Sequence, residues 1–196
     1  IMFNKPRLLT PGPTPLPERV RLALAQDMIH HRKPGFKKIL LETETMLQKL
    51  FGTEQPVLPL SCSGTGAMTA AVHGLFLPGE TVIVVNGGKF GERWSKIAAV
   101  RGLKVVEIDV AWGQAVTPAQ VEQALREHPE AKGVFMQVCE TSTAAQHPVE
   151  AIARLTRTRE VLLVADGISA VGISPCPMDA WGIDCLLTGS QKGLMV

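Results

Sequence analysis

Short apolar runs alternate with segments of helical pattern along most of this chain, and this alternation constrains the fold more than any other feature. Runs such as 81–85, 161–165 and 185–188 consist almost entirely of apolar residues, so both of their faces suit burial. Strands that are buried on both faces and separated by helices form a mainly parallel sheet with helices on each side. We therefore predict a three-layer α/β/α fold.

The expected elements follow from the same pattern. The expected strands are 57–60, 81–85, 104–108, 134–139, 161–165 and 185–188. The expected helices are 18–26, 36–51, 65–76, 91–100, 117–128 and 147–157. Residues 1–17 contain five prolines, which predicts an extended arm in front of a domain that fills residues 18–196.

Composition excludes several classes of function. A net charge of +2 without a basic run gives no electrostatic reason to expect nucleic acid. No apolar stretch approaches the roughly 20 residues that span a bilayer, and the start lacks the apolar core of a signal peptide, so we expect a cytoplasmic protein. The four cysteines form no CxxC pair and the five histidines have no ligand spacing, so no metal site is expected.

Polar segments follow the expected strands at their carboxyl ends. These segments are 63–66, 86–88, 140–143, Asp166 and Lys192. Ligands of parallel sheets collect at that edge, so the convergence predicts one binding site. Each segment alone is a weak signal.

Asp166 and Lys192 together indicate the cofactor pyridoxal 5'-phosphate. The lysine can form a Schiff base with its aldehyde, and the acid can keep its ring nitrogen protonated so that the ring accepts electrons. Two plainer interpretations stay open: Lys192 as a surface lysine, and Asp166 as the cap of a helix that begins near residue 168.

Three further segments suit parts of that cofactor. Residues 63–67 open a helix with glycines and hydroxyls, which is typical of a phosphate cradle, although an ordinary glycine-rich turn has the same pattern. Phe90 could lie against an aromatic ring or belong to the core. The Thr141 hydroxyl could reach a ring substituent or cap a turn.

The chain resembles the class V aminotransferases of the fold-type I pyridoxal-phosphate enzymes, especially the alanine–glyoxylate and serine–glyoxylate (serine–pyruvate) aminotransferases. The resemblance runs from Leu8 to the last residue. Its motifs are Ser63-Gly64-Thr65-Gly66, Pro78-Gly79-Glu80, Asn86-Gly87, Phe90-Gly91-Glu92-Arg93, Glu140-Thr141-Ser142-Thr143, Asp166 and Gly189-Ser190-Gln191-Lys192.

The resemblance implies a role for each matched position. Two positions depart from it. Some relatives have histidine where this chain has Ala67, which implies one phosphate donor fewer here, and the usual glycine after Ser142-Thr143 is Ala144. The implied roles are Lys192 as the Schiff-base lysine; Asp166 as the partner of the pyridine nitrogen; Thr65, Gly66, Ala67 and Gln191 at the phosphate; Phe90 and Ile168 on the two ring faces; Thr141 at the ring oxygen; and Gly12 beside the substrate.

The resemblance also implies an activity and a longer protein. It implies transfer of an amino group from serine or alanine to glyoxylate or pyruvate, by a homodimer with shared active sites. Relatives continue beyond the lysine into a small carboxyl-terminal domain, so we expect residues 18–196 to be a partial large domain and the chain to be incomplete. Two alternatives are a lyase such as a cysteine desulfurase and a non-catalytic cofactor-binding subunit, since some relatives carry hydrogenase-subunit names.

Overall fold

The fold is built around a five-stranded parallel sheet, as the alternation predicts. The computed structural model describes residues 8–196, so the first seven residues of the expected arm lie outside it. The strand order is β2-β1-β3-β6-β7 and every neighbouring pair is parallel. The strands are β1 (Thr81–Asn86), β2 (Lys104–Asp109), β3 (Gly133–Gln137), β6 (Leu162–Asp166) and β7 (Cys185–Leu187).

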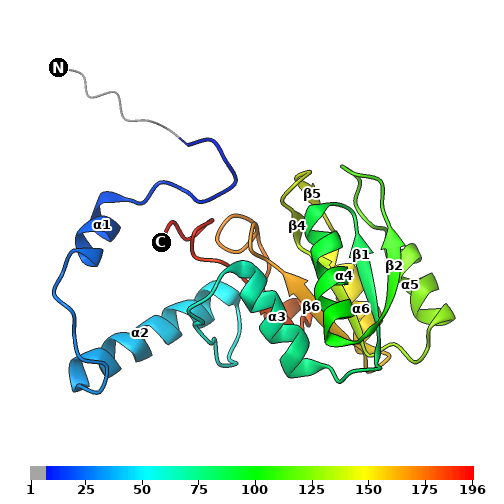
Figure 1. Cartoon of the computed structure of the whole chain (residues 1–196), viewed down its shortest axis with the longest axis horizontal. Coiled ribbons are helices and arrows are strands. Elements are labelled where there is room, and N and C mark those ends of the chain that lie inside the picture. Colours follow the sequence, from blue (N-terminus) through cyan, green and yellow to red (C-terminus); the bar gives the residue numbers. More distant parts are fainter. Residues whose placement is uncertain (1–7) are drawn as a thin grey trace.

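Helices cover both faces of this sheet, which confirms the three-layer arrangement (Figure 1). Alternate side chains of each strand point to opposite faces. Val82 and Val84 pack with helices α3 (Gly64–Leu75) and α4 (Lys89–Arg101). Ile83 and Val85 pack on the other face, where helices α5 (Pro118–Glu127), α6 (Val149–Arg157) and α7 (Met178–Trp181) lie.

The helix that begins after Thr117 illustrates how local sequence sets an element boundary. The Thr117 hydroxyl accepts a hydrogen bond from the backbone N–H of Gln120, and the Gln120 side chain accepts one from the backbone N–H of Thr117. This reciprocal pair satisfies two N–H groups that would otherwise lack partners in the first turn. The predicted helix start is confirmed.

Two expected strands differ from the structure. Residues 57–60 form no strand, and Leu58 and Leu60 are exposed; Pro59 has no N–H to donate to a sheet. The expected strand 134–139 is divided into β3 and β4 (Cys139–Glu140), because β4 leaves the sheet to pair in antiparallel fashion with β5 (Ala145–Gln146).

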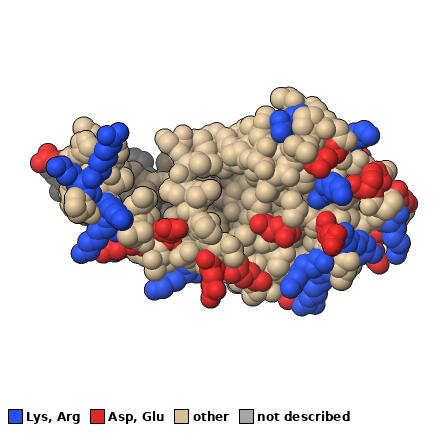
Figure 2. Space-filling model, turned by 90° about the horizontal axis from the view of Figure 1, so that it is seen from below, with Lys and Arg blue, Asp and Glu red and all other residues tan. Residues whose placement is uncertain are grey.

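The first two helices project from the sheet-containing body (Figure 1). They are α1 (Glu18–Leu24) and α2 (Pro34–Phe51), and α2 buries only Phe51. The helical spacing in 36–51 therefore predicts a helix correctly, yet most of its apolar side chains are exposed within residues 8–196. Basic side chains gather at this end, whereas both signs are mixed over the sheet-containing end (Figure 2). None of the helices in residues 8–196 combines the length and apolarity needed to cross a bilayer.

Candidate active site

The carboxyl ends of the parallel strands bring the predicted site residues to one edge of the sheet. Asp166 ends β6, Lys192 follows β7, and Thr141 follows β3 by way of the short strand β4. The turn that leads to Phe90 follows β1. Since β1, β3, β6 and β7 occupy successive places in the sheet, these four segments lie at neighbouring strand ends, as predicted.

Asp166 is a buried acid whose negative charge is only partly balanced by its surroundings. Its side chain is 4 % exposed, and its Oδ1 accepts a hydrogen bond of 2.9 Å from the backbone N–H of Ile168. Burial raises the pKa of Asp166 from 3.8 to about 6, and the charge of Glu140 adds to this rise, while the Ile168 bond and the charges of Arg93 and Lys192 oppose it. No lysine, arginine or histidine nitrogen of residues 8–196 lies within 4.0 Å of this carboxylate.

Lys192 lies in a loop that the amino-terminal arm holds in place. The backbone N–H of Thr14 donates to the Gln191 carbonyl at 3.0 Å, and the Thr14 hydroxyl donates to the Lys192 carbonyl at 3.1 Å. A Cβ at Gly12 would stand 2.9 Å from Lys192 Cε. The arm therefore needs a glycine where the lysine side chain passes, and the predicted position of Gly12 beside the substrate stays a prediction.

Residues 63–67, which the sequence predicts to hold a phosphate and which are called the phosphate loop below, lie at the start of helix α3. The Ser63 hydroxyl accepts a 3.2 Å hydrogen bond from the Gly66 N–H and caps the helix, so the positive end of the helix dipole faces this loop. A Cβ at Gly66 would stand 2.8 Å from the Cys62 Cβ, which leaves no room for a side chain. Ala67 lies in the first turn of the helix and carries no polar group.

Phe90 and Arg93 lie one turn apart on α4 and interact. The Arg93 guanidinium carbon is 4.8 Å from the centre of the Phe90 ring, a cation–π contact. Arg93 Nη1 also donates a 3.0 Å hydrogen bond to the Thr65 hydroxyl. Arg93 thus connects the residue predicted for the ring face with one predicted for the phosphate, a role that the sequence alone does not reveal.

Glu140 is a second site residue without a predicted role of its own. Its side chain is fully buried, and its carboxylate accepts hydrogen bonds from the backbone N–H groups of Phe90 and Gly91 at the start of α4. It also accepts a 2.6 Å bond from the Ser142 hydroxyl. Helix amino ends favour such anions. The sequence did contain a signal for Glu140, because it is an acid that follows an apolar strand, and the same signal identified Asp166.

Thr141 and Ile168 complete the predicted set. The Thr141 hydroxyl shares a hydrogen bond with the Ser169 hydroxyl, in the loop after β6. Ile168 is buried, and its Cδ1 would stand 2.5 Å from a Cβ at Gly64 in the phosphate loop. Ile168 therefore packs between Asp166 and the phosphate loop, and the loops after β4, after β6 and before α3 are held together.

These residues fit pyridoxal phosphate. The buried Asp166 has no cation of residues 8–196 in contact, and a protonated pyridine nitrogen is a cation of the required kind. Thr65 and the amino end of α3 suit a phosphate, and Lys192 offers the amine that binds an aldehyde. Gln191 lies beside Lys192, but its side chain occupies the space next to Gly189, so no contact with the phosphate loop is assigned to it.

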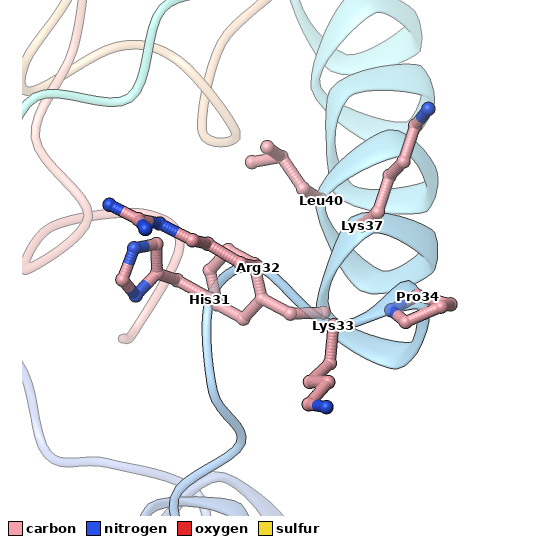
Figure 3. A pocket seen from close by; sticks show the side chains of 7 residues that line it. His31, Arg32, Lys33, Pro34, Lys37 and Leu40 are labelled. Atoms are coloured by element: carbon pink, nitrogen blue, oxygen red, sulfur yellow. The ribbon is translucent and has the colours of Figure 1, made fainter.

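A separate pocket lies at the start of α2. It has a volume of about 550 Å³ and is lined by His31, Arg32, Lys33, Pro34, Phe36, Lys37 and Leu40. Arg32, His31 and Leu40 extend to one side, whereas Lys33 and Lys37 point away (Figure 3). None of these residues belongs to the predicted cofactor site.

Comparison with known proteins agrees with this geometry. The family described as "Aminotransferase class-V" matches residues 11–195. The chain is 36% identical to a protein named soluble hydrogenase, small subunit, from Synechococcus sp., over all of this chain and 52% of that protein. It is 33% identical to a serine–glyoxylate aminotransferase from Methylorubrum extorquens, over 96% of this chain and 48% of that protein.

A solved structure shares the fold closely. The crystal structure of an alanine–glyoxylate aminotransferase from Nostoc sp. matches with a TM-score of 0.93 and 31% identity, over 100% of this chain and 52% of that one. The chain thus spans about half the length of the curated relatives it matches.

Proposed function

The chain belongs to the class V aminotransferases, a pyridoxal-phosphate-dependent family, and on that premise we propose that it forms part of an enzyme that transfers amino groups. The proposed donors are small amino acids such as serine or alanine, and the proposed acceptors are glyoxylate or pyruvate. The observation that carries the proposal is the buried Asp166 carboxylate, which shares one edge of the sheet with Lys192 and lacks a cationic partner in residues 8–196.

Each residue would contribute one physical task. When bound, pyridoxal phosphate supplies an electron-poor ring that stabilises negative charge on the substrate α-carbon. Asp166 would hold the proton on the ring nitrogen, because its ionised form is stabilised by a neighbouring cation. Lys192 Nζ would hold the cofactor aldehyde and then carry the proton that leaves the α-carbon.

The remaining residues would bind and orient the cofactor. Thr65 and the first turn of α3 would hold the phosphate, with Gly66 allowing close approach and Ala67 beside it. Phe90 would cover one face of the ring, with Ile168 on the other, and the Thr141 hydroxyl would contact the ring oxygen. Gly12, which lets the arm pass close to the Lys192 side chain, would border the substrate.

Borohydride reduction tests the covalent part of this proposal. The full-length protein is incubated with pyridoxal phosphate, reduced and digested, and we expect the added pyridoxyl mass on Lys192 alone. Lys192→Ala is the control and should carry no label. A label on other lysines in equal amount, or none, would refute the assignment.

A donor screen tests the amino-acid class. We expect L-serine or L-alanine to convert the cofactor absorbance of the full-length protein to that of the amino form, and glyoxylate or pyruvate to restore it. Production of sulfide from L-cysteine would instead support the lyase alternative. A homodimer, which the resemblance implies, stays a prediction that sedimentation of the full-length protein tests.

A second candidate function has one supporting observation. The relative from Synechococcus sp. bears the name of a hydrogenase small subunit and is 36% identical. A non-catalytic subunit would bind the cofactor at Lys192 but would not convert it with any amino donor. The two proposals therefore differ in the donor screen and agree in the borohydride test.

A further inference from the structure

We propose that Arg93 recognises the cofactor phosphate and makes the site selective for pyridoxal phosphate over unphosphorylated pyridoxal. This inference rests on the proposed function and assigns a further binding residue to the same site. Arg93 lies on α4, outside the phosphate loop itself.

The hydrogen bond between Arg93 and Thr65 sets the direction of the Thr65 hydroxyl. A guanidinium has five N–H donors and no acceptor, so Thr65 Oγ1 must accept the 3.0 Å bond from Arg93 Nη1. The hydrogen of that hydroxyl remains available to an anion. Arg93 therefore prepares Thr65 as a donor at the place where the phosphate is expected.

Arg93 also brings a positive charge that forms no ion pair within residues 8–196. Its residue is partly buried, and no carboxylate of residues 8–196 lies within 4.0 Å of its guanidinium. The neighbouring Glu92 pairs with Lys89 and Lys96 instead. A partly buried guanidinium without an acid is suited to an external anion, and phosphate matches its planar fork.

The rest of the site explains why such a cation is needed. Ala67, in the first turn of α3, has no side-chain donor, so the loop supplies backbone N–H groups and the Thr65 hydroxyl but no charge. The contact with the Phe90 ring, 4.8 Å from guanidinium carbon to ring centre, holds the Arg93 side chain in a defined orientation. The cation that the loop lacks is thus provided from the neighbouring helix.

Two aldehydes that differ only in the phosphate test this inference. Apoprotein of full length is titrated with pyridoxal phosphate and with pyridoxal, and the adduct at Lys192 is trapped with borohydride and quantified by mass. Arg93→Gln should weaken pyridoxal phosphate about 10- to 100-fold, the effect typical of losing a hydrogen bond to a charged group, and should leave pyridoxal little changed. Arg93→Lys keeps the charge without the fork and should fall between.

Lys96→Gln is the matched control, because it removes one positive charge from the exposed side of the same helix. It should change neither affinity. Equal weakening of both aldehydes by Arg93→Gln and Arg93→Lys would show a structural role and overturn the inference, as would an unchanged affinity for pyridoxal phosphate. If Arg93→Gln does not fold, the ratio measured with Arg93→Lys decides. Failure of the unaltered protein to bind either aldehyde at Lys192 would overturn the proposed function too.

Discussion

Replacing Asp166 with asparagine should stabilise the folded apoprotein at neutral pH while weakening the cofactor site. Burial raises the pKa of Asp166 from 3.8 to about 6. Each pH unit corresponds to about 1.4 kcal/mol, so the ionised carboxylate destabilises the folded apoprotein by about 3 kcal/mol above pH 6. Asparagine has nearly the same shape, can still accept the Ile168 N–H bond, and carries no charge.

The pH dependence gives this prediction its sign. Because the folded-state pKa lies above the unfolded value, the folded state binds the proton more tightly, and this group favours folding most below about pH 4. That contribution is lost as the pH rises from about 4 to about 6. The advantage of Asp166→Asn over the original protein should therefore be largest at pH 8 and should shrink as the pH is lowered through 6 towards 4.

Urea denaturation of the full-length apoprotein at pH 8 and pH 5 measures the effect. We expect a gain of about 3 kcal/mol at pH 8, a smaller gain at pH 5, and weaker retention of pyridoxal phosphate in the variant. Asp27→Asn, at an exposed position, is the control and should change little. A loss of stability of equal size at both pH values would refute the argument from burial.

Four further substitutions probe the site and the packing around it. Glu140→Gln replaces a carboxylate that accepts N–H bonds, including that of Phe90, with an amide. It should lower the free energy of unfolding in urea by about 2–3 kcal/mol, and an unchanged midpoint would contradict the importance of these bonds. Gly91→Ala would put a Cβ 2.7 Å from a backbone oxygen of β1 and should cost about 1–3 kcal/mol. By contrast, Gly74→Ala, with nothing within 4 Å, should gain up to about 1 kcal/mol; equal effects of these two glycine substitutions would count against the close approach. Gln137→Met removes a buried amide whose nitrogen and oxygen both lack a hydrogen-bond partner in residues 8–196. The melting temperature should therefore stay the same or rise. A loss of more than about 2 kcal/mol in the free energy of unfolding would show that the amide is paired.

The sequence by itself determined the class of fold and supplied the candidates for the reactive groups. Apolar runs and helical spacing are local patterns, so they predicted the parallel sheet, most element boundaries and the capped start of α5. Asp166 and Lys192 were recognisable because Asp166 is an acid that ends an apolar strand and Lys192 is an amine in the short polar segment after the next one. The local pattern failed at residues 57–60, where apolar residues alone did not make a strand.

Only the tertiary structure decided which of these groups meet. Glu140 bonds to Phe90, 50 residues earlier, because the strand order places β1 beside β3. Arg93 reaches Thr65 because α3 and α4 pack on the same face of the sheet, and Thr14 reaches Gln191 across 177 residues. Such contacts depend on the order of strands and the packing of helices, which are set by burial of the whole core, and no local stretch of sequence encodes them.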